Sequence, residues 1–345
     1  MHRLQCHSPL VFNKMLLVFF SSIHNQKAFD LIESPEIHGH AYLIKQKFPK
    51  IPLVVKFHMP LFVQMRLMNF YTTKLIRLRY FLGSLKRGHV RFFGYNNHLN
   101  DIDFKLTKLA DAYISPSRSL ASVLQKEWKL NPQKLSILPY PFMPPTSLLE
   151  IPILNRKTKI VSFIGKLNVQ KGIISLLKMI RKVVNSHPDV QFRLIGADSF
   201  YAARNIKMYD YISLELKGLE ENYMIKGAID NISVFQELAE TDICIFPSIW
   251  ENFPNVCLEA MSAGRAVIGS KNGGMSEMLQ DQAGIVIDPL DISAGASAIS
   301  NLLNDPLKRI ALGIKARSVV LERYNTERIG SMLETHFNKV IENAS

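Results

Sequence analysis

Cysteine is scarce in this sequence, and long hydrophobic runs are missing. The 345 residues include only Cys6, Cys244 and Cys257, which offer no disulfide framework and no ligand cluster at metal-site spacing. Buried free thiols are the simpler interpretation of the last two. No apolar run reaches the roughly 18 residues of a membrane-spanning helix, and the run 15–20 lacks the small-residue cleavage site of a signal peptide. These absences favour a protein of the reducing cytoplasm.

Acidic residues are absent between positions 37 and 100, although eleven lysines and arginines lie there. The formal net charge is +13, and removing these eleven from the 42 basic residues leaves 31 against 29 acidic residues. The positive excess therefore belongs to one segment, which suits an acidic partner. The residues concerned are Lys45, Lys47, Lys50, Lys56, Arg66, Lys74, Arg77, Arg79, Lys86, Arg87 and Arg91.

Part of this basic segment has the pattern of an amphipathic helix, because apolar residues follow one helical stripe and polar residues lie broadly opposite. Such a helix can lie on the anionic inner face of a membrane, and it can equally be a solvated helix packed on its own domain. Nucleic acid is a third partner for positive charge, but no nucleic-acid-binding motif accompanies it. The apolar stripe is Leu67, Tyr71, Leu75, Leu78 and Leu82, and the opposite face holds Arg66, Thr73, Lys74 and Arg77.

Alternating strand and helix patterns run along the whole chain, and 47% of the residues are hydrophobic. This alternation predicts an α/β protein with parallel sheets, and the length suffices for two domains with separate cores. Prolines around a polar stretch mark a linker. We therefore expect a first domain over 1–145, a linker over 146–157 and a second domain over 158–325. A C-terminal helix, 326–345, can pack back on the first domain.

In the first domain, a helix is predicted over 8–24 from the spacing of Val11, Met15, Val18 and Phe19. A short strand over 29–32 and a loop over 33–36 follow. The apolar residues 51–57 predict a buried parallel strand that delivers His58 at its carboxyl end. A histidine there can serve as a general base or a hydrogen-bond donor, although a lone histidine is more often structural.

The second domain contains a stretch in which chemistry is expected to concentrate. The apolar strand 243–246 leads to a loop with Glu251, and the following helix carries Glu259. Asn255 is predicted to cap this helix, whose first amides would then favour a phosphate. The pair Gly273–Gly274 makes a turn with uncovered amides. Ligands of α/β proteins bind beside the carboxyl ends of strands, so both carboxylates can face one crevice.

A second loop, after the predicted strand 159–164, carries two lysines. Lys166 and Lys171 flank a turn that opens a helix, so two ammonium groups and the amide end of the helix can converge on a diphosphate. The alternative is two solvated lysines beside a helix start. The position of this loop at the head of a domain with a second suitable loop favours the phosphate site.

The spacing of Glu251 and Glu259, with Gly273 to Glu277 downstream, resembles the signature of the retaining nucleotide-sugar glycosyltransferases of family 4. The strand, the Pro-Ser turn and the Glu-Asn-Phe-Pro run that surround it strengthen the likeness. The resemblance implies the GT-B fold, in which two Rossmann-like domains face each other across a cleft. The lysine loop is similar as well, with Lys166 where the family has arginine. Lysine keeps the charge but loses the fork that holds two phosphate oxygens, so we expect weaker but surviving donor binding.

The resemblance also implies roles for individual residues. Lys166 and Lys171 would contact the diphosphate of a UDP- or GDP-linked sugar, and Glu259 the ribose. Glu251 would face the donor sugar, and His58 would lie near the reacting centre, which makes these two the candidate catalytic residues. The remaining candidates for donor binding are Phe253, Asn255, Val256, Gly273, Gly274 and Glu277.

No cofactor or metal is expected beyond the nucleotide-sugar itself, because lysines and helix amides can stabilise the departing diphosphate. Asp101 and Asp103 look like the Asp-x-Asp metal motif of another glycosyltransferase fold, but acids are favoured at a helix start in any case. The implied acceptor is a glycan or a lipid-linked glycan, and the expected location is the cytoplasm, in part at the inner membrane face.

One departure from the family concerns the first domain. Members begin with a strand, a glycine-rich turn and a helix, whereas residues 1–36 contain no glycine. We therefore expect an incomplete first domain in a GT-B fold. Two alternatives to an active glycosyltransferase stay open: an impaired or partner-dependent subunit that keeps the nucleotide pocket, and a polyanion-binding protein that uses residues 37–100.

Overall fold

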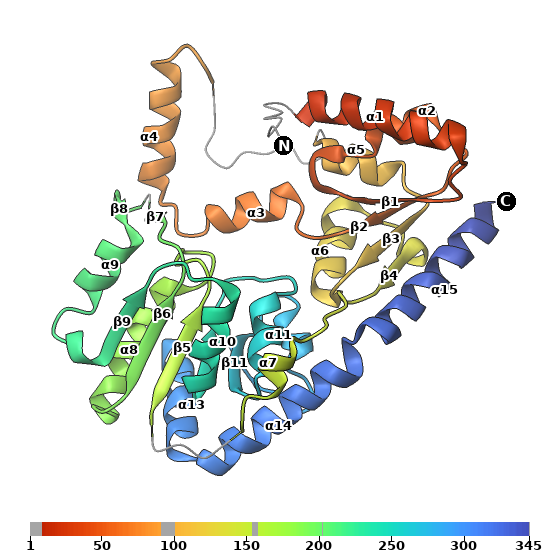
Figure 1. The fold of residues 1–345 in the computed structure, drawn as a ribbon. Coiled ribbons are helices and arrows are strands. Elements are labelled where there is room, and N and C mark those ends of the chain that lie inside the picture. Colours follow the sequence, from red (N-terminus) through yellow and green to blue (C-terminus); the bar gives the residue numbers. More distant parts are fainter. Residues whose placement is uncertain (1–8, 91–100, 154–157, 202, 345) are drawn as a thin grey trace.

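The computed structural model of the chain describes residues 9–90, 101–153, 158–201 and 203–344. It is an α/β structure with two parallel sheets, as predicted (Figure 1). The first sheet has the order β1-β2-β3-β4, and the second has the order β12-β11-β10-β5-β6-β9. Cys6, Arg91 and residues 154–157 of the predicted linker lie outside the described ranges, whereas Cys244 and Cys257 are fully buried.

The first sheet is built from sequential parallel strands, so that Val55 lies opposite Tyr113 and Ile114 opposite Ser136. Its core includes Phe57 and Trp128, which are almost completely buried. In chain order the elements are α1 (Pro9–Gln26), β1 (Ile32–Pro35), η1 (Ile37–Gly39), α2 (Tyr42–Lys47), β2 (Leu53–Lys56), α3 (Leu61–Met68), α4 (Lys74–Leu85), α5 (Ile102–Lys108), β3 (Ala112–Ser115), α6 (Arg118–Trp128), η2 (Pro132–Lys134) and β4 (Leu135–Ile137).

The strand predicted over 29–32 is wrong, because β1 occupies residues 32–35. Phe29 instead lies against α1, where its ring is 5.0 Å from that of Phe20 and 5.8 Å from that of His24. The helix predicted over 8–24 is confirmed as α1. Its stripe of Val11, Met15, Val18 and Phe19 nevertheless points outward, since α1 packs on the core through the opposite face.

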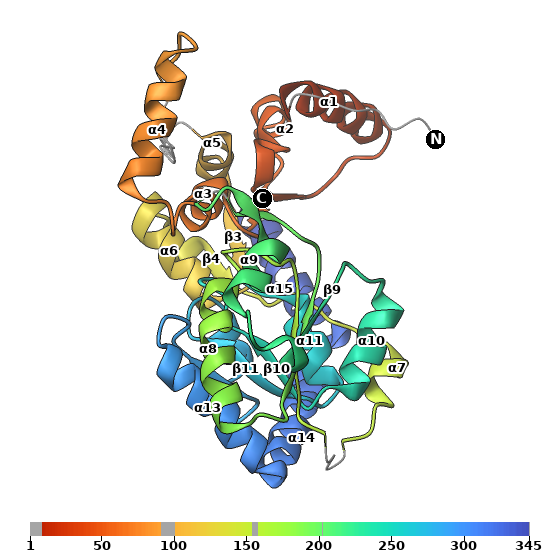
Figure 2. The ribbon, with the colours of Figure 1, turned by 90° about the vertical axis from the view of Figure 1, so that its left-hand side faces the viewer.

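The predicted amphipathic stripe does not belong to one continuous helix. It is divided between α3 and α4, which are separated by residues 69–73. Leu67 is buried in the first core, whereas Leu75, Leu78 and Leu82 are exposed on α4. In both ribbon views α4 extends away from the body of the molecule (Figures 1 and 2).

The second sheet is covered on both faces. Helices α8, α9 and α13 contribute to the core on one face, and α7, α10, α11 and α14 to the core on the other (Figure 2). The elements are α7 (Thr146–Leu149), β5 (Ile160–Ile164), α8 (Ile173–Ser186), β6 (Gln191–Ile195), β7 (Phe200–Tyr201), β8 (Ile206–Lys207), α9 (Met208–Glu215), η3 (Glu220–Asn222), β9 (Tyr223–Lys226), α10 (Asn231–Glu240), β10 (Ile243–Phe246), α11 (Asn255–Ser262), β11 (Ala266–Ser270), α12 (Met275–Met278), β12 (Ile285–Ile287), α13 (Ile292–Asn304), α14 (Pro306–Arg323) and α15 (Thr326–Ala344).

The connection between the sheets contains structure that the prolines did not predict. Residues 146–149 form α7, whose Leu148 is fully buried in the second core. The C-terminal helix α15 runs back to the first sheet, where Val340 packs with Val54, Ile114 and Leu138 (Figure 1). None of the helices in the described ranges is both long and apolar enough to cross a membrane.

Candidate active site

All the predicted site residues except His58 follow three adjacent strands of the second sheet. After β5 the chain passes to β6 on one side, and it later returns to β10 on the other. The gap between β5 and β10 is therefore the topological switch point, where the loops diverge and a ligand can enter. The loops after β5, β10 and β11 meet at this edge.

Lys171 and Glu251 are brought into direct contact here. The Nζ atom of Lys171 lies 2.5 Å from Oε2 of Glu251, and the two side chains are 25% and 12% exposed. The backbones are joined as well, because the amide of Ile249 donates to the carbonyl of Gln170 at 2.9 Å. The sequence predicted one crevice for these residues, but it did not predict that the acid neutralises the lysine.

Two glycines allow the loops to approach this closely. Gly172 has φ +79°, and a Cβ atom there would lie 1.7 Å from the carbonyl oxygen of Pro247. Gly273 has φ +90°, and a Cβ atom there would lie 1.9 Å from the carbonyl oxygen of Glu251. Both positions thus need glycine for space and for backbone conformation. Next to the second glycine, the amide of Gly274 donates to that same Glu251 carbonyl at 2.9 Å.

The prediction that Asn255 caps the following helix is wrong. Pro254, with φ −77° and ψ 123°, is the N-cap, and Asn255 is the first residue of α11. The buried ring of Phe253 and the fixed φ of proline set the entry to the helix. The amides of Asn255 and Val256 nevertheless belong to the first turn, where they lack intrahelical acceptors.

Glu259 lies one turn further along α11 and is half-buried. Burial raises the pKa of its carboxyl group. Lys166, directly after β5, is exposed. Neither side chain makes an ion pair with another residue that the structure describes, whereas Lys171 and Glu251 pair with each other.

On the first domain, His58 follows β2 and is held by a carboxylate that the sequence did not single out. Glu36 has no exposed surface, and it accepts hydrogen bonds from the amides of His58 at 2.9 Å and Met59 at 2.7 Å. The Nδ1 atom of His58 lies 3.1 Å from the Lys56 carbonyl oxygen and 3.4 Å from Oε2 of Glu36. Because both neighbours are acceptors, Nδ1 carries the proton in the neutral ring and Nε2 is left as the acceptor.

The two domains touch through polar side chains next to this histidine. Asn252 receives a hydrogen bond from the Ser117 hydroxyl at 2.7 Å, and its own amide group donates to the His58 carbonyl at 2.5 Å. Glu277 accepts from the amides of Arg118 and Ser119, both at 3.0 Å. Its carboxylate therefore lies at the amino end of α6, where negative charge is favoured.

A series of aromatic rings continues the contact between the domains. His58 stacks on Tyr140 with the ring centroids 5.4 Å apart, and Tyr140 lies 5.7 Å from Phe253. Phe253 in turn lies 5.3 Å from Tyr324. Burial raises the pKa of Tyr140, whose hydroxyl donates to the Phe57 carbonyl at 2.8 Å, and it raises the pKa of Tyr324 to about 12. The hydroxyl groups of Tyr140 and Tyr324 thus remain neutral at physiological pH.

The acids at the start of α5 have a structural explanation. Asp101 is the N-cap and accepts from the amide of Asp103. Asp103 is buried, and burial together with the nearby Asp101 raises its pKa to about 7. Within the described ranges, no three or more histidine, cysteine, aspartate or glutamate side chains gather as a metal site would require.

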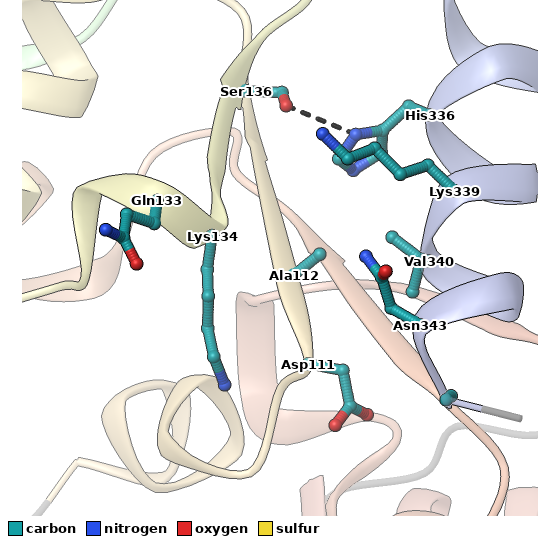
Figure 3. A pocket seen from close by; sticks show the side chains of 10 residues that line it. Asp111, Ala112, Gln133, Lys134, Ser136, His336, Lys339, Val340 and Asn343 are labelled. Carbon is teal, nitrogen blue, oxygen red and sulfur yellow. Dashed lines mark hydrogen bonds between the residues drawn. The ribbon is translucent and has the colours of Figure 1, made fainter.

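A cavity of about 370 Å³ lies away from these residues, between β3, β4 and α15 (Figure 3). Ser136 and His336 meet across it, with 3.2 Å between Oγ and Nδ1. Burial lowers the pKa of His336. None of the predicted site residues lines this cavity, so it belongs to the packing of the C-terminal helix on the first sheet.

The first and second sheets each form the core of one domain, and the C-terminal helix returns from the second domain to the first. This is the arrangement of the GT-B fold. Residues 158–305 match the family model of glycosyl transferases group 1. The chain has the GT-B fold, and residues 158–305 of its second domain are similar to that family.

Sequence relatives match the chain over about half of its length. It is 25% identical over 183 residues to a GDP-mannose-dependent monoacylated alpha-(1-6)-phosphatidylinositol monomannoside mannosyltransferase of Corynebacterium glutamicum, covering 51% of this chain and 46% of the relative. It is 29% identical over 184 residues to a lipopolysaccharide 1,2-N-acetylglucosaminetransferase of Salmonella typhimurium, covering 51% and 47%. The chain thus spans about half the length of these relatives.

Solved structures resemble the whole chain in fold. Sucrose-phosphate synthase from Thermosynechococcus elongatus has a TM-score of 0.72 at 20% identity, covering 99% of this chain and 81% of that one. HepE from Anabaena, in complex with UDP, has a TM-score of 0.68 at 17% identity, covering 94% and 82%.

Proposed function

We propose that the protein is a retaining, metal-independent glycosyltransferase. It transfers a sugar from a UDP- or GDP-linked donor to a glycan or a lipid-linked acceptor. The observation that carries this proposal is the contact between Lys171 and Glu251 at the switch point of the second sheet. The names of its relatives support it, since they describe enzymes that act on a phosphatidylinositol mannoside and on lipopolysaccharide.

The donor diphosphate would replace Glu251 as the partner of the Lys171 ammonium group. In the ligand-free protein this pair is largely buried, so each charge compensates the other. A diphosphate offers Lys171 more negative charge, and its arrival would release Glu251 to accept from the sugar hydroxyls. Lys166 and the first amides of α11 would then stabilise the charge that develops on the departing nucleoside diphosphate. Glu259 would hold the ribose.

The acceptor would meet His58 on the other side of the cleft. Glu36 would act as a positioning residue, because it holds the backbone of His58 and orients the imidazole. With Nδ1 directed at acceptors, Nε2 can take a proton from a hydroxyl group or hydrogen-bond to the donor sugar. Retention is part of the proposal through the family 4 resemblance of Glu251 and Glu259.

Donor binding and sugar transfer with two single variants test this proposal. Lys171→Ala removes a charged hydrogen bond to phosphate, which should weaken nucleoside diphosphate binding about 10- to 100-fold. Glu251→Ala should lower the transfer rate. Lys178→Ala is the matched control, since Lys178 is exposed on α8. Transfer that persists unchanged in both site variants would exclude this site.

A partner-dependent subunit is the second candidate, and one observation favours it. The outer face of α1 exposes Val18 at 71% and Phe19 at 65%, and β1 lies at an edge of its sheet. Edges and apolar faces of this kind invite pairing with another polypeptide. The native mass of the purified chain, measured together with its activity, separates the candidates, because an active monomer excludes the second.

The proposed location is the cytoplasm, at the anionic inner face of a membrane. The support is the basic segment 37–100, which contains no acidic residue. Polybasic segments gain affinity for such surfaces through electrostatic attraction.

A further inference from the structure

Asn252 of the second domain bonds two neighbouring loops of the first domain. It is only 3% exposed. Its Nδ2 atom lies 2.5 Å from the carbonyl oxygen of His58, and its Oδ1 atom lies 2.7 Å from the Ser117 hydroxyl. His58 follows β2 and Ser117 follows β3, which are adjacent strands of the first sheet. One amide group from the second domain therefore connects the carboxyl ends of both strands.

The chemistry of the partners fixes the direction of these hydrogen bonds. A backbone carbonyl can only accept, so the NH2 group of Asn252 faces His58 and its oxygen faces Ser117. The Ser117 hydroxyl accepts from the amide of Leu120 at 3.1 Å, and it gives its own proton to Asn252. An ordered series of donors and acceptors thus runs from the first turn of α6 through Asn252 to the backbone of His58.

Close packing between the domains surrounds this amide group. A Cβ atom at Gly274 would lie 2.0 Å from the carbonyl oxygen of Asn252 and 2.7 Å from the Cβ of Ser117. Glycine is therefore needed at this position for the two loops to approach each other. Because Asn252 and Ser117 are both buried, a group that loses its partner here is left without a replacement from water.

The same residue relates the two candidate catalytic side chains to each other. Asn252 directly follows Glu251 in the chain, and Glu251 pairs with Lys171 on the donor side. On the other side, Glu36 bonds the backbone amide of His58, while Asn252 bonds the carbonyl of that residue. The backbone of His58 is thus held from both domains, and the contact from the second domain comes from the residue next to Glu251.

We propose that Asn252 is a positioning residue for sugar transfer, which sets the distance between the Glu251 carboxylate and the His58 imidazole. It acts through the backbone of both residues. A displacement of about 1 Å between reacting groups can lower a rate about 100-fold, and the loss of this buried contact allows such a displacement. The inference deepens the proposed function and rests on it for the roles of Glu251 and His58.

Transfer kinetics of three single variants test the proposal. Asn252→Ala removes both hydrogen bonds and should lower kcat about 10- to 100-fold, with less than about a twofold change in the KM for the nucleotide-sugar. Asn252→Asp keeps the size and the acceptor for Ser117, but it places an oxygen against the His58 carbonyl, so its kcat should fall at least as far. Ser117→Ala interrupts the same series of bonds, so adding it to Asn252→Ala should lower kcat little further.

A pH series on the two variants of Asn252 tests the hydrogen bond to His58 directly. When the carboxyl group of Asn252→Asp takes up a proton, it regains a donor for that carbonyl. The ratio of its kcat to that of Asn252→Ala should therefore rise as the pH falls from neutrality toward about 4, the ordinary pKa of an aspartate. The titration of the His58 ring is common to both variants and cancels in the ratio. A ratio that stays level would overturn the role of this bond.

Asn222→Ala is the matched control. Asn222 is 8% exposed, and its amide group also donates to carbonyl oxygens, at 2.8 Å to Pro188 and 3.1 Å to Val190. It precedes β9 and so lies at the amino ends of the strands, opposite the candidate site. The control should lower the free energy of unfolding about as much as Asn252→Ala and keep the wild-type kcat. Thermal unfolding with UDP and GDP establishes that each variant is folded.

The outcomes separate this inference from the proposed function. The ring of His58 stacks on Tyr140 at 5.4 Å, so NMR of its ring protons reports its position without any turnover. In Asn252→Ala these signals should move toward those of free histidine, and unchanged signals in a folded variant would overturn the positioning role. A wild-type kcat in Asn252→Ala would also overturn it, even where Lys171→Ala has lost donor binding. A wild-type chain without transfer activity would refute the proposed function, and the NMR comparison would still decide whether Asn252 positions His58.

Discussion

Substitution of Glu36 is the most direct test of how the first domain positions His58. We predict that Glu36→Gln reduces the sugar-transfer rate by about 100-fold, at the lower end of what general acid–base catalysis contributes. The carboxylate accepts from two backbone amides and lies 3.4 Å from Nδ1 of His58. A carboxamide keeps the size but turns one acceptor oxygen into a donor, so it cannot satisfy all three neighbours.

The stability effect follows from the same contacts. Hydrogen bonds to a charged group contribute about 1.5–3 kcal/mol each, against about 1 kcal/mol for neutral ones. Replacing two charged bonds with neutral ones, in a site without solvent, should lower the free energy of unfolding by about 1–4 kcal/mol. Urea denaturation measures this loss.

The assay combines transfer kinetics with nitrogen-15 NMR of the His58 ring. The wild type should show the proton on Nδ1, and Glu36→Gln should show a mixture of tautomers with unchanged affinity for UDP or GDP. Glu33→Gln is the control, because Glu33 lies three residues earlier on β1, its side chain is 37% exposed and it contacts Lys56 instead. A folded Glu36→Gln protein with the wild-type transfer rate would refute the positioning role.

Three further predictions concern stability. Lys171→Met and Glu251→Gln should each destabilise the ligand-free protein by about 1–3 kcal/mol, and the double variant should lose clearly less than the sum of the two. A double-mutant cycle measured by urea denaturation checks this, and additive losses would argue against the ion pair. Gly172→Ala should lower the free energy of unfolding by more than about 2 kcal/mol, because its Cβ would lie 1.7 Å from a backbone carbonyl oxygen. Gly83→Ala, with nothing within 4 Å of the added Cβ, should leave that free energy unchanged or raise it. Equal effects of the two substitutions would contradict this packing. Asp103 has a pKa raised to about 7 from an ordinary value of 3.8, so its folded form holds the proton more tightly. Stability relative to Asp103→Asn should fall by up to about 1.4 kcal/mol per pH unit as the pH rises from about 4 to 7, and it should be level above that; a parallel pH dependence of the two proteins would contradict the raised pKa.

The contact of Glu277 with α6 links the two domains. Its carboxylate, from the second domain, lies on amides of the first, next to the bridge that Asn252 makes between Ser117 and His58. If the donor sugar draws Glu277 toward itself, as the family resemblance implies, this link between the domains is exchanged for a ligand contact.

Much of the second domain was predictable from its sequence, because the signals are local. Apolar runs of strand length that end at Gly165, Pro247 and Ser270 mark the carboxyl ends of β5, β10 and β11. In a parallel sheet these ends lie at one edge, so the residues that follow them had to meet. The charged loops around Lys171 and Glu251 could therefore be assigned to one crevice before any coordinate was known.

Tertiary structure alone decided the rest. Periodicity shows that a helix has an apolar stripe but not which way the stripe faces, and for α1 and α4 it faces outward. The pairing of Lys171 with Glu251 spans 80 residues, and that of Glu36 with His58 spans 22. Such contacts depend on how strands order within a sheet and how two sheets face each other, and neither is encoded in the spacing of neighbouring residues.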